Sequence, residues 1–251
     1  MKKVIAILNQ KGGVGKTTTA INLGAYLAKM GRRVLIVDFD PQGNATSGLG
    51  IAKDDLKLSS YDALFDAKLI PKVVLETRWP GLFIVPTNTA LASAEVELVG
   101  STHREFKLKD MLHQADYDYI FIDCPPSLGL LTINALTAAD GVLIPVQAEY
   151  YALEGLSQLL SVVQRVRQGL NPKLELFGVV LTMYDSRTSL AEQVYNEVKK
   201  HFGTKLFKTV VPRNVRLAEA PSYGRPISDH DKWSKGAKAY KQLAKEVEKH
   251  V

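Results

Sequence analysis

The sequence has 251 residues, of which 46% are hydrophobic, and this suits one α/β domain or at most two. Its single cysteine, Cys124, excludes an intramolecular disulfide framework, and no apolar run approaches the length of a membrane span. We therefore expect a soluble cytoplasmic protein. The net charge is +6, yet residues 199–251 alone carry 13 Lys/Arg against 5 Asp/Glu. That excess is typical of a surface that binds a polyanion or of a solvated lysine-rich face, and charge alone leaves both open.

Residues 10–18 predict a phosphate-binding loop between a strand over 4–8 and a helix over 16–29. Gly12, Gly13 and Gly15 let backbone N–H groups turn towards an anion, and the helix N-terminus adds partial positive charge there. Lys16 can reach the β- and γ-phosphates, and the Thr17 hydroxyl can bind Mg²⁺. The nucleotide-binding residues predicted in this loop are Lys11, Gly12, Gly13, Val14, Gly15, Lys16, Thr17 and Thr18.

The second predicted strand, over residues 33–37, ends in two carboxylates. Residues 39–50, which follow it, are too rich in glycine and small polar residues to predict a regular element. An open α/β sheet places its ligand at the carboxyl ends of parallel strands, so Asp38 and Asp40 should lie near the phosphates. One could help to hold Mg²⁺ through water and the other could orient the attacking water. Alternatively, Asp38 only caps the next turn.

Residues 51–115 carry no chemistry that the sequence reveals, and we interpret them as scaffold around the sheet. Short helices are predicted over 59–65, 91–99 and 104–114, and a strand over 82–85. The strand over 119–123 ends in Asp123, which we expect beside the phosphate-binding loop as a ligand of Mg²⁺. Cys124 follows as a small buried residue. Two prolines at 125–126 are typical of a switch that senses the γ-phosphate, or of a rigid turn.

The rest of the chain alternates helices and strands. Helices are predicted over 128–138, 151–169, 188–202 and 232–249, and strands over 141–146, 174–183 and 206–211. The alternation predicts a single α/β domain over residues 1–251, with a mostly parallel twisted sheet and helices on both faces. The last predicted helix is too poor in large apolar residues for a strong membrane anchor.

Three segments resemble the ParA/Soj family of partition ATPases. Residues 11–17, KGGVGKT, resemble the deviant Walker A motif with its additional lysine, Lys11. Residues 38–44, DFDPQGN, resemble the second motif of that family, and residues 122–126, IDCPP, resemble its Walker B motif. The resemblance covers nearly the whole chain. It implies a P-loop NTPase fold and the short chromosomal form, which lacks an N-terminal helix-turn-helix domain.

The resemblance also implies a mechanism. ATP and Mg²⁺ are the implied cofactors, and weak ATP hydrolysis is the implied reaction. Two subunits would enclose two nucleotides in a homodimer, and Lys11 would reach the nucleotide of the second subunit. A centromere-binding partner of the ParB/Spo0J type would stimulate hydrolysis. The implied catalytic residues are Lys11, Lys16 and Asp40, the metal-binding residues are Thr17, Asp38 and Asp123, and the adenine-binding loop contains Pro212 and Asn214.

The implied dimer binds double-stranded DNA without sequence preference on the nucleoid, and the basic C-terminal segment fits such phosphate contacts. Arginine near a loop or a helix end can form a bidentate contact with phosphate oxygens. A solvated side chain remains the alternative for each single lysine. The candidate DNA-binding residues are Arg187, Arg213, Arg216, Lys199, Lys200 and Lys235.

Three other classes share the phosphate-binding loop. A MinD-like membrane ATPase needs a C-terminal amphipathic helix with large apolar residues, which this chain does not offer, so no membrane partner is expected. A protein like the nitrogenase iron protein needs two cysteines from each subunit for its cluster, and this chain has one. A small-molecule kinase is allowed by the loop alone, but Lys11 and the lack of an obvious acceptor site argue against it.

Overall fold

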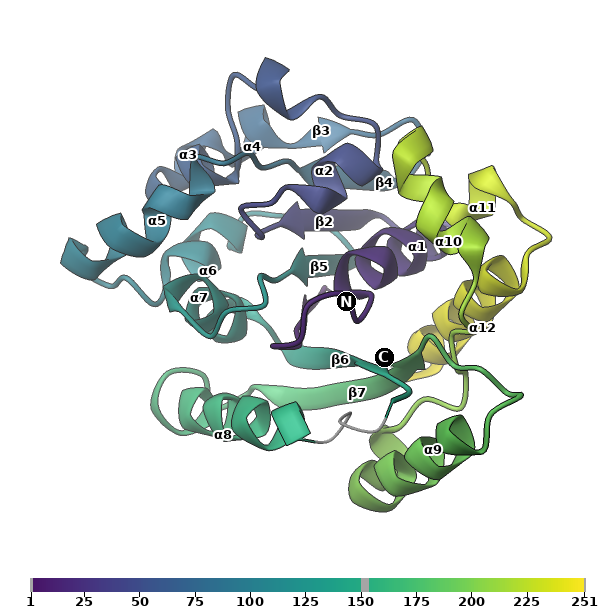
Figure 1. Ribbon diagram of the computed structural model, residues 1–251. Coiled ribbons are helices and arrows are strands. Elements are labelled where there is room, and N and C mark those ends of the chain that lie inside the picture. The colour runs from purple at the N-terminus through teal and green to yellow at the C-terminus, as the bar shows by residue number, and fades with distance from the viewer. Residues whose placement is uncertain (1, 150–153, 251) are drawn as a thin grey trace.

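A seven-stranded sheet runs through the protein, and the computed structural model describes residues 2–149 and 154–250 (Figure 1). The strand order is β3-β4-β2-β5-β1-β6-β7, and every pairing is parallel except that of β3 with β4. The strands are β1 (Lys3–Ile7), β2 (Val34–Asp38), β3 (Leu75–Glu76), β4 (Leu82–Val85), β5 (Tyr119–Asp123), β6 (Gly141–Gln147) and β7 (Glu175–Thr182).

Helices cover both faces, because the inner strands are apolar on both sides and neither face can be left in water. On β1, Val4 and Ala6 belong to one buried cluster, whereas Ile5 and Ile7 belong to the other. The first face carries α3 (Ser60–Phe65), α4 (Ile70–Val73), α5 (Leu91–Glu97), α6 (Lys107–Leu112), α7 (Leu130–Ala138), α8 (Glu154–Gly169) and α9 (Ser189–Phe202). The second carries α1 (Lys16–Lys29), α2 (Asn44–Gly48), α10 (Val215–Glu219), α11 (Ile227–His230) and α12 (Lys235–His250). The predicted mostly parallel α/β sheet with two covered faces is confirmed.

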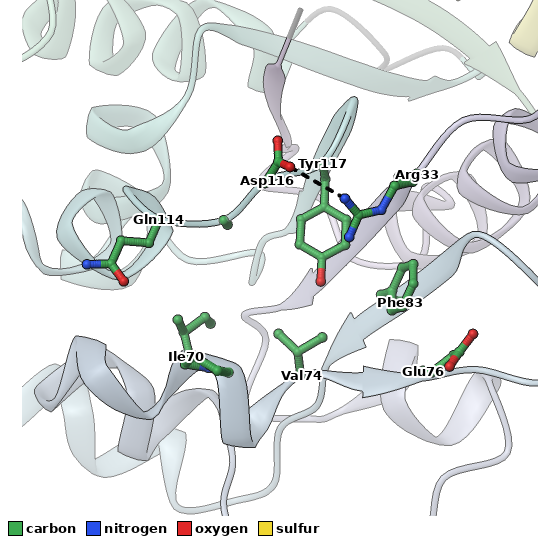
Figure 2. A pocket seen from close by; sticks show the side chains of 10 residues that line it. Arg33, Ile70, Val74, Glu76, Phe83, Gln114, Asp116 and Tyr117 are labelled. Atoms are coloured by element: carbon green, nitrogen blue, oxygen red, sulfur yellow. Dashed lines mark ion pairs between the residues drawn. The ribbon is translucent and has the colours of Figure 1, made fainter.

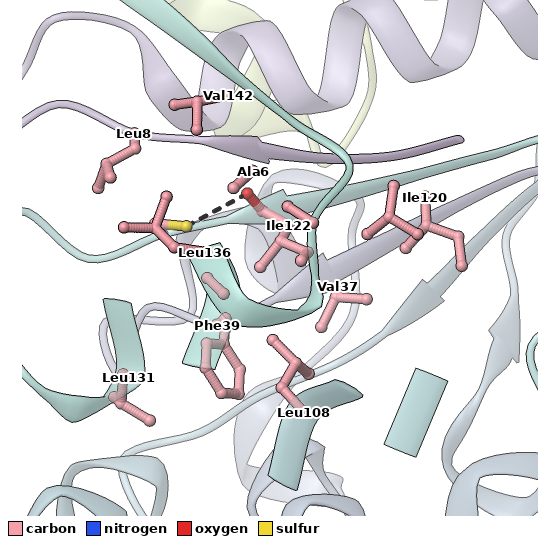
Figure 3. Close-up of a cluster of buried hydrophobic side chains, with 14 of the residues drawn as sticks. Ala6, Leu8, Val37, Phe39, Leu108, Ile120, Ile122, Leu131, Leu136 and Val142 are labelled. Atoms are coloured by element: carbon pink, nitrogen blue, oxygen red, sulfur yellow. Dashed lines mark hydrogen bonds between the residues drawn. The ribbon is translucent and has the colours of Figure 1, made fainter. Parts of the chain in front are cut away.

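The buried cluster on the first face contains Cys124 (Figure 3). Its thiol donates a hydrogen bond to the carbonyl oxygen of Ile122 at 3.6 Å, and Leu8 and Leu136 belong to the same cluster. Burial raises the pKa of this thiol far above its ordinary value, so Cys124 stays protonated. Cys124 is therefore a buried core residue, as the sequence predicts.

The prediction that residues 39–50 form no regular element is wrong, because α2 lies within them. Gly43 begins this helix in the left-handed conformation, with φ 62°. The carboxylate of Asp38 then accepts hydrogen bonds from the Thr46 amide at 2.7 Å and from the Thr46 hydroxyl at 2.6 Å. A buried carboxylate thus stabilises a short helix whose own sequence has little helical propensity.

The prediction of a strand over residues 206–211 is also wrong, since this segment forms one isolated bridge with β7, between Leu206 and Val179. The amides of Phe207 and Val211 donate to β7 carbonyls at 2.9 and 2.8 Å. Between them, the amide of Lys208 and the hydroxyl of Thr209 donate to the Glu246 carboxylate on α12, at 3.0 and 2.6 Å. These contacts with α12 take backbone groups that a continuous ladder would need.

Smaller differences concern the ends of elements. The predicted helix over 104–114 is reduced to α6, and the helix over 91–99 ends as a 3₁₀ turn, Leu98–Gly100. The two-residue strand β3 was not predicted. The predicted start of α8, at 151–153, lies outside the described residues. Within residues 2–149 and 154–250, every helix is too short or too polar to cross a bilayer.

Candidate nucleotide-binding site

The predicted phosphate-binding loop joins the carboxyl end of β1 to the first turn of α1. Gly13 and Gly15 have left-handed backbones, with φ 74° and 91°. A Cβ atom on Gly15 would meet nothing nearer than 3.8 Å, so the backbone angle, and not crowding, requires glycine there. Gly12 and Gly13 are exposed at the tip of the loop, whereas Val14 is buried beneath it.

Two side chains that sequence reasoning missed brace this loop from below. Asn9 donates to the Pro145 carbonyl at 2.7 Å and accepts from the Lys11 amide at 3.0 Å. Thr182, at the end of β7, donates its hydroxyl hydrogen bond to the Val14 carbonyl at 2.8 Å. Asn9 follows β1 and Thr182 ends β7. A polar residue at the carboxyl end of a predicted strand was the sequence signal that could have identified them. They connect the loop to β6 and β7.

Lys16 lies in the first turn of α1 with a mostly buried side chain. Its ammonium donates to the Lys11 carbonyl at 3.4 Å, which is a long hydrogen bond for a charged donor. Burial lowers the pKa of Lys16, and the negative charge of Asp123 opposes this shift. A buried ammonium with one weak acceptor is suited to bind the oxygens of a phosphate.

Asp123, at the end of β5, is fully buried, and neither of its carboxylate oxygens has a hydrogen-bond partner within the described part of the chain. Burial raises the pKa of Asp123 well above its usual range, and the charge of Asp38 adds to this increase. The nearby Thr17 hydroxyl and Lys16 act in the opposite direction on that pKa. The unpaired oxygens make Asp123 a ready ligand for a cation.

Asp38 is opposite Asp123 in the register of β2 and β5. One of its oxygens holds α2 through Thr46, while the other has no partner among the described residues. Burial raises the pKa of Asp38 to about 6. Asp38 thus caps α2, as the alternative interpretation expected. Its second oxygen remains available for a cation.

These carboxylates fit Mg²⁺, the metal that the sequence predicts. Two buried acids side by side, with three oxygens unpaired, disfavour their own ionisation until a cation is supplied. Among the described residues, no three His, Cys, Asp or Glu side chains form a complete cage. Mg²⁺ ordinarily uses one or two carboxylates and completes its shell with phosphate oxygens and water. Asp123, Asp38 and Thr17 would supply the protein's part.

Asp40 lies in the turn after β2, and its carboxylate accepts a hydrogen bond from the Gln42 amide at 3.0 Å. Its charge affects both Lys16 and Asp123, so the three residues share one site. Lys11, at the exposed lip of the loop, forms an ion pair with Glu149 of the same chain. The structure therefore brings Lys16, Asp40 and Asp123 together and places Lys11 on the outer side.

A cavity of about 340 Å³ adjoins the loop where the adenine ring was predicted to lie. Gly15 and Thr18 line one side, and Pro212 and Asn214 line the other. Asn214 also caps α10 by accepting a hydrogen bond from the Leu217 amide at 3.2 Å. The cavity has further lining residues that sequence reasoning missed, among them Thr182, Met183, Leu217 and Tyr240. They come from the end of β7 and the residue after it, from α10 and from α12, and no local motif joins them.

A larger hollow, of about 420 Å³, lies at the opposite edge of the sheet (Figure 2). There the Arg33 guanidinium lies over the rings of Tyr117 and Phe83, at 5.1 and 5.9 Å from their centres, and pairs with Asp116 at 3.5 Å. This hollow is at the amino ends of β2 and β5, away from the loop and from the buried acids Asp38 and Asp123. The smaller cavity is therefore the candidate nucleotide site.

The predicted DNA-binding residues fall into separate groups. Arg187 forms a bidentate ion pair with Asp185, at 2.9 and 2.7 Å, and Arg213 is close enough to act on the same carboxylate. Arg216 pairs with Glu219 at 2.9 Å and with Asp231 at 3.7 Å. The predicted lysines, Lys199 and Lys200 at the end of α9 and Lys235 at the start of α12, are exposed. The structure does not gather all six into one patch.

Comparisons with known proteins show the family of this chain. A family model described as "AAA domain" matches residues 2–176. The sporulation initiation inhibitor protein Soj of Bacillus subtilis is 59% identical over 249 residues, which are 98% of each chain. The chromosome partitioning protein ParA of Myxococcus xanthus is 55% identical and covers 98% of this chain and 88% of its own.

A solved structure with the same fold contains a nucleotide. It is titled cobyrinic acid a,c-diamide synthase from Mycobacterium smegmatis with bound ATP analogue and magnesium, and it has a TM-score of 0.87 and 38% identity. It covers 100% of this chain and 96% of its own. Its title names another activity, so the family follows from the higher identity to Soj and ParA over the full length. This chain belongs to the Soj/ParA family of chromosome-partitioning ATPases.

Proposed function

We propose that this protein is a chromosome-partitioning ATPase that binds Mg-ATP and hydrolyses it slowly. The observation that supports this best is the buried pair Asp38 and Asp123, whose unpaired oxygens lie beside Lys16 and the phosphate-binding loop. Such a pair needs a cation, and the adjoining cavity of about 340 Å³ has room for a purine ring. Family membership and the magnesium and ATP analogue in a structural relative support the same ligands.

Each residue has a role in this proposal. Lys16 and the loop amides would bind the β- and γ-phosphates, and Thr17, Asp38 and Asp123 would hold Mg²⁺, which would supply further positive charge to the phosphate oxygens. Asp40 orients the attacking water. Pro212 and Asn214 hold adenine at the far end of the cavity.

The oligomeric state depends on the nucleotide in this proposal. Lys11 leaves Glu149 and reaches the nucleotide of a second subunit, so that two sites face each other across a two-fold axis. The exposed position of Lys11 at the lip of the loop supports this reach. Because ADP lacks the γ-phosphate, only ATP supplies the full contact between subunits.

The ATP-bound dimer then binds double-stranded DNA on the nucleoid without sequence preference, and a ParB/Spo0J-type partner stimulates hydrolysis and release. The positive charge of residues 199–251 supports the DNA contact. A MinD-like membrane function is less well supported. The apolar residues of α12, including Tyr240, Leu243 and Val247, are buried against the second face of the sheet and cannot enter a bilayer without unpacking.

The dimer can be tested with Asp40→Ala. Removing the water-orienting carboxylate should leave ATP binding intact and block hydrolysis, so the variant should accumulate as a dimer in Mg-ATP and remain monomeric in ADP. Light scattering coupled to size exclusion gives the mass. Asp54→Ala, on the exposed 3₁₀ turn Lys53–Asp55, is the matched control and should behave as the parent. A monomeric Asp40→Ala variant with bound ATP would contradict the proposed switch.

A further inference from the structure

A groove of about 400 Å³ lies between the end of α1 and the outer side of α12, and its lining residues differ from those of the nucleotide cavity. Its floor is formed by Tyr26 and Ser228, which are buried. Lysines and two exposed apolar side chains form its walls. We call it the lysine groove, and its wall residues are Lys29, Lys232, Lys241, Lys245, Met30 and Trp233.

The lysines of this groove lack an acidic partner among the residues that the structure describes. Within residues 2–149 and 154–250, Lys29, Lys232, Lys241 and Lys245 form no ion pair within 4 Å, and Lys29 donates only to the Ser228 carbonyl, at 3.0 Å. Arg216, by contrast, is already paired with acids of its own chain. A lysine without a carboxylate partner can neutralise a phosphate of a polyanion, and the release of the counterions condensed on that polyanion drives binding.

The groove continues along α12. Lys238, Lys241, Lys245 and Lys249 are exposed and spaced three or four residues apart, so they share one side of the helix. The stripe is about 16 Å long at 1.5 Å per residue. Duplex DNA carries one phosphate for about every 1.7 Å of its axis, so a straight stripe of this length matches several phosphates.

Trp233 adds a second feature of nucleic-acid surfaces. Its side chain is 75% exposed, and the Lys232 ammonium lies 5.3 Å from the centre of its ring. An exposed indole beside a cation can pack on sugar and phosphate without loss of the positive charge. The groove also borders the predicted arginine contact, because Arg216 pairs with Asp231, the residue before Lys232.

We propose that the lysine groove and the stripe on α12 bind the phosphate backbone of double-stranded DNA, as an extension of the surface around Arg216. This inference rests on the proposed function and adds a location and residues to it. An anionic membrane is the poorer match, because Met30 and Trp233 are the groove's only exposed large apolar side chains in the described part of the chain, while the apolar side of α12 is buried.

The test uses the full chain with Lys241→Gln and Lys245→Gln combined. The control is Lys68→Gln with Lys72→Gln, which removes two exposed lysines at the same spacing from another part of the protein. Binding of a labelled random-sequence duplex is measured by fluorescence anisotropy in Mg-ATP over a range of salt concentrations. Each lost phosphate contact should reduce the slope of log K against log salt by about 0.9, so the double variant should lose about 1.8 for each subunit that contacts the duplex. At 0.15 M salt its affinity should be roughly thirtyfold weaker for each such subunit, relative to a 1 M reference.

Trp233 provides a second readout. The chain has two tryptophans, so in a protein carrying Trp79→Phe the fluorescence comes from Trp233. DNA should change this fluorescence when Lys241 and Lys245 are present and should not change it when both are replaced by glutamine. The groove variant and the control variant should both hydrolyse ATP at the rate of the parent and should both melt at the temperature of the parent. If the parent and the double variant have equal affinity and equal slopes, the lysine groove does not bind DNA, although the proposed function stands. If the parent itself fails to bind DNA in Mg-ATP, the proposed DNA function fails with it. Binding to anionic vesicles and not to DNA would also overturn the inference.

Discussion

Asp123→Asn should stabilise the protein without ligand and abolish its response to Mg-ATP. The parent carboxylate is fully buried, and both of its oxygens lack partners in the described chain. Replacing it with an amide of the same shape removes the buried charge and removes the ligand for Mg²⁺. The same residue is therefore expected to oppose folding and to support function.

The size of the effect follows from burial. An unsatisfied buried polar group costs about 1–3 kcal/mol, and a charged one costs more. The asparagine amide keeps the first cost, so the variant gains only the additional cost of the charge, which we take as about 1–3 kcal/mol. In a chain of this size 1 kcal/mol shifts the melting temperature by about 2–4 °C, so the variant should melt about 2–12 °C above the ligand-free parent. At a ligand concentration of about 100 Kd, the parent should gain about 2.7 kcal/mol from Mg-ATP, and the variant should gain nothing.

The pH dependence has a definite sign. The folded-state pKa of Asp123 lies well above its ordinary value of 3.8, because burial disfavours the charged form. A carboxyl group of this kind stabilises the fold at low pH, and its contribution is lost as pH rises through the folded-state pKa. The difference in melting temperature between Asp123→Asn and the parent should therefore be small near pH 4 and should increase with pH.

Thermal melts with and without Mg-ATP, from pH 4 to pH 8, test this reasoning. Asp116→Asn is the control, since it makes the same change on an exposed side chain just before β5. It should move the melting temperature by less than about 1 °C and keep the response to ligand. If Asp123→Asn melts below the parent at pH 7, or if Mg-ATP stabilises both equally, the reasoning about Asp123 is refuted.

Two further substitutions test other parts of the site. Lys16→Ala should abolish ATP hydrolysis because no other buried ammonium lies in the described loop, and turnover equal to that of the parent in a phosphate-release assay would refute this assignment. Asn214→Ala should destabilise the protein by about 1 kcal/mol through loss of the α10 cap and should weaken ATP binding, measured by calorimetry. Unchanged ATP affinity would remove Asn214 from the adenine site and leave it as a cap.

The features that sequence predicts best are local. The glycine pattern of residues 12–15 sets the backbone of the phosphate-binding loop, and the apolar strands that end in Asp38 and Asp123 indicate neighbours in a parallel sheet. Their side-by-side position follows because β2 pairs with β5. These signals depend on a few adjacent residues.

The predictions that failed depend on contacts between different elements of the fold. Helix α2 forms because Asp38 caps it from the preceding strand, and residues 206–211 leave the sheet because Glu246 binds their polar groups from α12. Met183, which follows β7, and Tyr240, on α12, line the nucleotide cavity. Propensity and periodicity contain no information on such contacts.

The sequence also does not show which basic side chains are free to bind phosphate. The sequence gives the excess of basic residues after residue 199, but only the fold shows which of them are paired. Arg187 and Arg216 look like the better phosphate ligands by residue type, yet both already contact acids of their own chain. Lys241 and Lys245 have no such partner among the described residues, although nothing in their local sequence distinguishes them from other lysines.

The most direct measurement is the affinity for a random-sequence duplex without nucleotide, with ADP and with ATP, each at two salt concentrations and with the mass of the protein followed in parallel. We expect tight, salt-sensitive binding by a dimer in ATP and weak binding by a monomer in the other two states. Equal affinity in all three states, or a monomer in ATP, would contradict the claim that the γ-phosphate joins two subunits into the DNA-binding form.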